Sequence, residues 1–197
     1  MNLPHPLILA SASRGRAELL LAAGYDFIQD PTGIPEPAPA PGEDPAAHAR
    51  RLARLKAEAA VRRHPGALVL AADTIAFCGD RILGKPRDED DAIAMLAYLA
   101  GRPHTLVSAL CVAFMPPGGA PRFEAGEDRA EVTLRPWSHA RLRRHVERVK
   151  PLFCAGAYAL QEGGLSIVEK LEGDPSTVVG LPLDLLDRLL ARMKGPS

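Results

Sequence analysis

Aromatic side chains are scarce in this sequence, since Phe, Trp and Tyr together make up 5% of its 197 residues. The core therefore has to be built mainly from Leu, Ala, Val and Ile, and the 47% hydrophobic content suffices for one large domain or two small lobes. Net charge is also lacking, because 24 Lys and Arg balance 24 Asp and Glu. This balance argues against broad electrostatic capture of nucleic acid, yet it allows a small basic pocket for a phosphorylated molecule.

Long apolar runs are missing as well, and none approaches the roughly 20 residues that span a bilayer. We therefore expect no membrane partner, and the absence of positive charge ahead of the apolar residues near the amino terminus predicts no signal peptide. The three cysteines, Cys78, Cys111 and Cys154, are odd in number and far apart. That excludes a full disulfide set and a paired zinc-ligand spacing, so we expect buried thiols in a reducing cytoplasm.

Several catalytic motifs are absent too. The six histidines form no His-Glu-x-x-His run, and neither a Gly-x-Ser-x-Gly elbow nor a Gly-x-Gly-x-x-Gly fingerprint occurs. The segment 79–85 matches most of a phosphate loop, but Pro86 follows where Ser or Thr would hold Mg²⁺. Gly79-Asp80 is also typical of a hairpin turn. We therefore reject a phosphate-loop kinase or ATPase, and retain Lys85 as a cation that could meet a phosphate.

Apolar periodicity predicts both helices and strands along the chain. The connection over 31–45 is dense in proline, which excludes a helix or a central strand there and predicts an exposed loop. Mixed elements with at least one antiparallel pair predict a mixed α/β domain over 1–197. We expect helices over 14–23, 46–63, 88–100, 138–149 and 182–193, and strands over 7–10, 25–29, 67–77, 105–114, 123–134 and 165–171.

The segment 11–16 follows a strand and opens a helix, which is a favourable place for an anion. Ser11 and Ser13 offer hydroxyls, and Arg14 and Arg16 offer guanidinium groups suited to phosphate oxygens. An ordinary capped helix with solvated arginines would have the same local sequence. Both interpretations stay open at this point.

Asp73 and Thr74 stand at the end of the most apolar strand, where a carboxylate could bind a metal ion or activate water. A structural cap would look the same in sequence. Glu36, in the proline-rich loop, and Lys56, on the following helix, become candidates if they converge on Asp73. Each of them alone is typical of a solvated side chain.

Together these segments resemble the Maf family of nucleoside triphosphate pyrophosphatases. The similarity lies in 7–20 (LILASASRGRAELL), in 71–110, and in 155–183 (AGAYALQEGGLSIVEKLEGDPSTVVGLPL). Weaker agreement between these stretches extends it over nearly the whole chain, and the order and spacing of separate motifs make it specific.

The resemblance implies an elongated mixed-sheet α/β architecture, like that of inosine triphosphatases, with two lobes around a central cleft, usually homodimeric. It implies attack of water on the α-phosphorus of a nucleoside triphosphate with pyrophosphate leaving, in a house-cleaning role. Asp73 matches the proposed proton acceptor, and Glu36 matches an acidic position that shares Mg²⁺, or Mn²⁺, with it. The remaining matches are the phosphate-binding positions Ser11, Arg16, Lys56 and Lys85 and the substrate-choice positions Thr74 and Gln161.

The sequence departs from the family pattern at two places. The first motif is usually Ser-x-Ser-Pro-Arg/Trp-Arg, whereas Arg14 and Gly15 stand here, so the position that separates dTTP/UTP enzymes from 7-methyl-GTP enzymes is uninformative. Thr74 and Gln161 follow the dTTP/UTP subgroup. The segment 175–177 replaces a Tyr-Tyr-Asn-like stretch. A nucleotide-binding regulator of cell division without turnover is the alternative, and the presence of Asp73 and Glu36 favours the enzyme.

Overall fold

The computed structural model describes residues 3–160 and 164–193, which fold into two compact units. The first unit consists of Met1–Asp73, Ser108–Asp128 and Gly180–Ser197, and the second consists of Thr74–Val107 and Arg129–Val179. Each unit has a hydrophobic core of its own. Three long strands, β3 (Leu68–Cys78), β5 (Pro103–Phe114) and β6 (Arg122–Leu134), contribute residues to both units.

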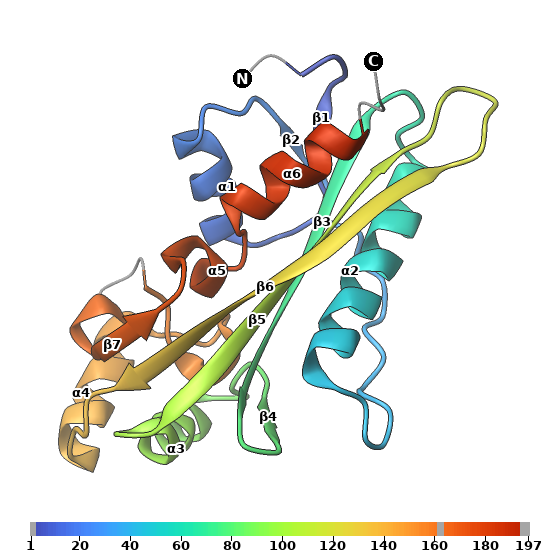
Figure 1. The fold of residues 1–197 in the computed structure, drawn as a ribbon. Helices are drawn as coiled ribbons and strands as arrows, with labels where there is room; N and C mark the ends of the chain where they lie inside the picture. Colours follow the sequence, from blue (N-terminus) through green and yellow to red (C-terminus); the bar gives the residue numbers. More distant parts are fainter. Residues whose placement is uncertain (1–2, 161–163, 194–197) are drawn as a thin grey trace. The chain divides into compact units, whose positions relative to one another are not determined.

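Within the described residues the strands form one seven-stranded sheet in the order β2-β1-β3-β5-β6-β7, with β4 paired to β3 (Figure 1). The additional strands are β1 (Leu7–Leu9), β2 (Ile28–Gln29), β4 (Arg81–Leu83) and β7 (Val168–Glu172). β1 runs parallel to both β2 and β3, while β4 is antiparallel to β3 and β7 is antiparallel to β6. The sheet is therefore mixed, as the sequence predicts.

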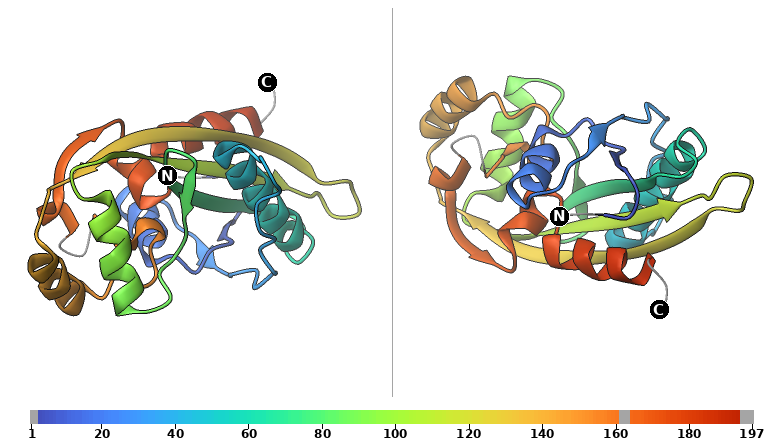
Figure 2. Two further views of the ribbon diagram at one scale, coloured as in Figure 1. Left: turned by 90° about the horizontal axis from the view of Figure 1, so that it is seen from below. Right: turned by 90° about the horizontal axis from the view of Figure 1, so that it is seen from above.

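In the first unit, helices cover both faces of the strands (Figure 2). Helix α6 (Leu183–Met193) packs its leucines with α1 (Arg14–Ala22) against one face, which includes Leu68, Leu70 and Ala72 of β3. Helix α2 (Pro45–Val61) lies on the opposite face, and its buried side chains are mostly alanines, which let the helix approach closely. Asp44 caps α2 by accepting a hydrogen bond from the Ala47 amide at 3.0 Å, and Pro45 follows at the first helical position.

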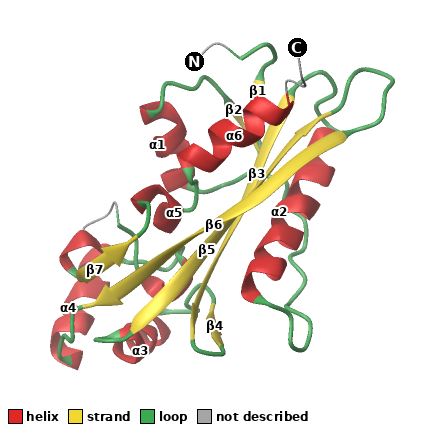
Figure 3. Ribbon diagram, in the orientation of Figure 1, coloured by secondary structure: helices red, strands yellow, loops and turns green. Residues whose placement is uncertain are grey.

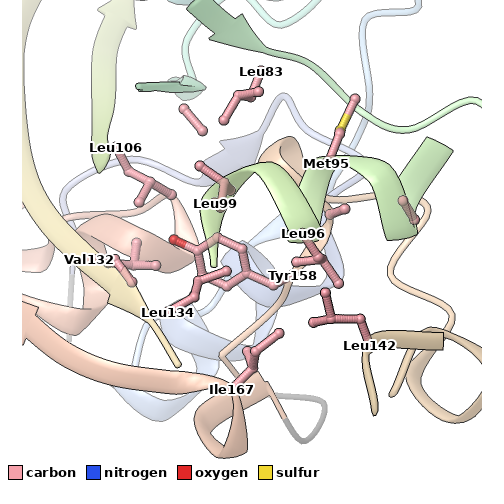
Figure 4. Packing of buried hydrophobic residues seen from close by; sticks show 14 of the residues in the cluster. Leu83, Met95, Leu96, Leu99, Leu106, Val132, Leu134, Leu142, Tyr158 and Ile167 are labelled. Carbon is pink, nitrogen blue, oxygen red and sulfur yellow. The ribbon is translucent and has the colours of Figure 1, made fainter. Parts of the chain in front are cut away.

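The second unit contains α3 (Glu89–Leu99), α4 (His139–Val149), α5 (Pro175–Val179) and the short 3₁₀ turns η1 (Ala155–Ala157) and η2 (Gly164–Ser166). Figure 4 shows how its core gathers around Leu99 and Tyr158, with Leu96 and Leu142 joining α3 to α4. Tyr158 is a buried aromatic residue of this largely aliphatic core, and Tyr98 and Trp137 pack against the core from partly buried positions.

Most of the predicted elements are confirmed, including the β3–β4 hairpin around Gly79 and the long connection without helix or strand before α2 (Figure 3). Four details of the prediction were wrong. The second strand comprises only Ile28–Gln29, the last strand begins at Val168 because η2 precedes it, and α5 was not predicted. Asp73 and Thr74 lie in the middle of β3, which continues to Cys78, and not at its end. In the described part of the chain, no helix is long and apolar enough to cross a membrane.

Candidate active site

Asp73 is directed toward α2 by the alternation of side chains along β3. Leu68, Leu70 and Ala72 face the α6 side, so the odd-numbered residues face the α2 side. Asp73 therefore follows Val69 and Ala71 on the α2 side and remains 7% exposed. A carboxylate placed this deep requires a partner, because an unpaired buried charge is strongly disfavoured.

Lys56 of α2 is that partner. Its Nζ lies 2.6 Å from Asp73 Oδ1 and 2.7 Å from Glu36 Oε1, so one ammonium group binds both carboxylates. The side chains of Lys56 and Asp73 are 13% and 10% exposed, whereas Glu36 is 50% exposed. The structure thus brings together three of the predicted residues from a strand, a helix and a loop.

Arg16 lies beside this group, and its guanidinium is held on three sides. Nη1 donates to Ser11 Oγ at 3.0 Å and to the Ala72 carbonyl at 2.9 Å, while Nε donates to the Gly180 carbonyl at 2.9 Å. Burial lowers the pKa of Arg16, and the carboxylates of Asp73 and Glu36 oppose that shift. Arg16 therefore ties the start of α1 to the middle of β3, at the residue just before Asp73.

The other residues of the first motif have local roles in the structure. Ser13 caps α1 by accepting a hydrogen bond from the Arg16 amide at 3.4 Å, and its own amide donates to Ser11 Oγ at 3.2 Å. Arg14 points to solvent, where its Nε donates to Glu18 at 2.7 Å. The capped-helix interpretation is thus correct for Ser13, and an additional phosphate contact from either residue stays a prediction.

Glu36 is positioned by a loop that runs antiparallel to α2 and is attached to it at both ends (Figure 1). Near the start of the helix, Arg51 Nη2 donates to Glu43 Oε2 at 2.7 Å and to the Ala38 carbonyl at 3.2 Å. The hydrogen bond from Arg51 lowers the pKa of Glu43 to about 2. These contacts fix the loop on the amino-terminal side of Lys56.

The opposite end of the same loop is attached just beyond the end of α2. Asp30 Oδ2 lies 2.7 Å from His64 Nε2 and 2.9 Å from Arg63 Nη2. The hydrogen bond from His64, together with Arg63, lowers the pKa of Asp30. Glu36 therefore sits on a loop with a cationic attachment on each side, which limits the positions its carboxylate can take.

A divalent metal ion fits the donor set of Glu36 and Asp73. Two carboxylates converge on one cation position, and among the described residues no group of three or more His, Cys, Asp or Glu side chains could form an all-protein cage. Mg²⁺ typically binds through one or two carboxylates and completes its shell with water and substrate phosphates. Two carboxylates are therefore too few for a closed structural metal site, and a metal role for this pair stays a prediction.

Two of the remaining predicted residues, Thr74 and Lys85, lie in the second unit. Thr74 follows Asp73 on β3 and is half-buried, and Lys85 lies exposed just after β4. Gln161 lies outside the described residues. The roles of these three residues in substrate binding stay predictions.

Sequence reasoning missed the backbone carbonyls that hold Arg16 and the two attachments of the proline-rich loop. The carbonyls carry no sequence signal. The loop attachments join Asp30 to Arg63 and Glu43 to Arg51, a reverse order that is apparent only once the partners are known. That order is typical of two segments running antiparallel.

Comparison with known proteins agrees with the resemblance seen in the sequence. The chain is 40% identical over 188 residues to the dTTP/UTP pyrophosphatase of Nitratidesulfovibrio vulgaris, covering 95% of this chain and 88% of that protein. It is 42% identical over 186 residues to the dTTP/UTP pyrophosphatase of Myxococcus xanthus, covering 94% and 91%. The structure of the Staphylococcus aureus Ham1 protein is similar at a TM-score of 0.47 and 14% identity, covering 96% of this chain and 98% of that one. Residues 6–193 match the family described as Maf-like protein, and the chain belongs to that family.

Proposed function

We propose that this protein hydrolyses nucleoside triphosphates to nucleoside monophosphates and pyrophosphate. The observation that carries the proposal is the group formed by Glu36, Lys56 and Asp73, where Asp73 lies in the middle of the largely buried strand β3. Hydrolysis of a triphosphate requires cations that neutralise phosphate charge and carboxylates that hold a metal ion and orient water. One cation, Lys56, and two carboxylates, Glu36 and Asp73, are present at this position. The relatives of the chain carry the name dTTP/UTP pyrophosphatase.

In the proposed reaction, the oxygen of a water molecule forms a bond to the α-phosphorus as the bond to the α–β bridging oxygen breaks. Pyrophosphate leaves with that oxygen. Asp73 accepts the water proton, and the Lys56 ammonium group lies 2.6 Å from its Oδ1. No covalent nucleophile is required. The alternative is that the Asp73 carboxylate acts as a metal ligand and not as the proton acceptor.

Glu36 and Asp73 would hold the divalent ion, and we propose Mg²⁺, with Mn²⁺ as a substitute. The bound ion would supply positive charge to the phosphate oxygens and to the leaving pyrophosphate. Lys56 Nζ occupies the point where the two carboxylates meet, so the ion would bind them from another side, and the ammonium group would add a second positive charge beside it. Ser11, Arg16 and Lys85 are proposed to contact or orient the phosphates.

For the substrate we propose dTTP and UTP, or modified forms of them. The names of the relatives support this choice, as do Thr74 and Gln161, which match the residues of that subgroup. 7-Methyl-GTP is the alternative substrate. We further propose a cytoplasmic homodimer without nucleic-acid or membrane partners. The zero net charge supports the absence of a nucleic-acid partner, and the lack of a disulfide at Cys78, Cys111 and Cys154 supports a reducing compartment.

The test is pyrophosphate release from dTTP, UTP, 5-methyl-UTP, 7-methyl-GTP and ATP with Mg²⁺, comparing the unmodified protein with Asp73→Asn. We expect pyrophosphate rather than orthophosphate, and a loss on the order of 10²–10³-fold in the variant, the typical effect of removing one group that stabilises the transition state. Glu18→Gln, an exposed acid paired with Arg14, is the matched control and should retain full activity. If folded protein binds the nucleotides and cleaves none, the regulator without turnover becomes the better description.

A further inference from the structure

Helix α4 forms one wall of a second site, which lies in the second unit and contains none of the residues discussed above. An open pocket of about 690 Å³ is lined by Arg141, Arg144 and Arg148, with Trp137 just before the helix. The arginines are spaced by three and four residues, so they lie on one face of the helix. The volume falls in the range of roughly 300–1,000 Å³ that is typical of sites for small ligands.

His145 lines the same pocket and is 3% exposed, and neither of its ring nitrogens has a hydrogen-bond partner. Burial and the nearby charge of Arg148 lower its pKa, so the ring is neutral and carries one donor and one acceptor. Buried polar groups in folded proteins are nearly always hydrogen-bonded. Two unpartnered nitrogens beside a pocket therefore indicate a molecule that would bind there and satisfy them.

The charges around the pocket indicate an anion. Arg141 stacks over the Trp137 ring at 4.0 Å, whereas Arg144 and Arg148 form no ion pair with any residue in the described part of the chain. Arg143, on another face of α4, does reach an acid, Asp90, at 3.8 Å. Like charges four residues apart destabilise a helix, and a bound anion would relieve that repulsion.

We propose that this pocket binds a small phosphorylated molecule, with Arg144 and Arg148 on the phosphate oxygens and the His145 N–H as a further donor. Three arginines against the single carboxylate of Glu147 leave two positive charges among the lining residues, which matches a phosphate dianion. Guanidinium groups bind phosphate through paired hydrogen bonds, which favours this ligand over a halide ion. This pocket is separate from the proposed catalytic site, because none of its lining residues is Glu36, Lys56 or Asp73.

The chain contains one tryptophan, so Trp137 reports on this pocket directly. We would titrate the full protein with inorganic pyrophosphate in the presence of a chelator and record the tryptophan emission. Inorganic phosphate and uridine monophosphate, titrated separately, distinguish an inorganic ligand from a nucleotide. We expect saturable binding, and nitrogen-15 histidine spectra in which the His145 resonances move with the same midpoint.

Variants decide whether the signal comes from this pocket. Arg144→Gln combined with Arg148→Gln, both exposed positions, should weaken binding by at least about tenfold, since charge-assisted hydrogen bonds are lost. Arg143→Gln is the matched control on the same helix. Lys56→Gln removes the cation of the proposed catalytic site around Asp73. Both should leave the titration unchanged. An unchanged emission at millimolar ligand, or a signal that is lost in Lys56→Gln and retained in the double variant, would overturn the proposal. Neither outcome depends on catalytic activity.

Discussion

Replacing Arg16 with methionine should destabilise the protein far more than replacing any exposed arginine. The guanidinium makes three hydrogen bonds, to Ser11 Oγ and to the Ala72 and Gly180 carbonyls, and the residue is 9% exposed. Hydrogen bonds to a charged group contribute about 1.5–3 kcal/mol each, which gives a gross loss of roughly 4–9 kcal/mol. Removing a buried charge recovers several kcal/mol of desolvation. We therefore expect a net loss of about 2–4 kcal/mol in the free energy of unfolding.

Urea unfolding followed by far-ultraviolet circular dichroism measures this loss. Arg14→Met is the matched control, because Arg14 lies two residues away on the same helix with its side chain 80% exposed, and its variant should stay within about 0.5 kcal/mol. Arg16→Lys should recover only part of the stability, since an ammonium group cannot reach all three acceptors in the same geometry.

The result that would refute this reasoning is a folded Arg16→Met protein whose unfolding free energy lies within about 1 kcal/mol of the unmodified chain. If such a protein had also lost only its affinity for triphosphate, Arg16 would act as a phosphate ligand without a structural role. A loss of stability together with a raised KM would mean that both roles belong to the same side chain.

Three further predictions concern the loop that carries Glu36 and a turn in the second unit. Arg51→Gln should raise the Mg²⁺ concentration needed for activity severalfold, because Glu36 is then less well positioned. Arg50→Gln is the control on the same helix and should leave that concentration unchanged. Equal shifts in both variants would contradict the role of Arg51 in positioning the loop. The depressed pKa of Glu43 means that its contribution to stability is present above about 4.5 and is lost as pH falls toward about 2. Acid unfolding of Glu43→Gln should accordingly depend less on pH in that window, and an unchanged slope would show that Arg51 does not stabilise the ionised form. Gly173→Ala should cost about 1–3 kcal/mol in urea unfolding, because φ is +107° and the new Cβ would lie 3.0 Å from the Arg129 carbonyl oxygen; a neutral effect would contradict that backbone geometry.

The amino-acid sequence by itself determined the kinds of elements and the class of fold. Apolar runs such as 67–72 are typical of buried strands, and the prolines of 31–45 exclude a helix or a central strand. These signals are local, since they depend on periodicity and backbone chemistry within a few residues. The family resemblance was also available from the sequence, because motif order and spacing are properties of the chain alone.

Only the tertiary structure decided which charged residues are partners. Glu36, Lys56 and Asp73 are 17 to 37 residues apart in the chain. Glu36 and Lys56 alone were compatible with solvated side chains, and Asp73 alone with a structural cap. Their meeting depends on the side-chain alternation of β3 and on the face that α2 presents to it. The burial of Arg16 and the unpartnered ring of His145 also depend on distant segments that exclude water. Sequence patterns report local periodicity, whereas burial and charge pairing arise from contacts between remote parts of the chain.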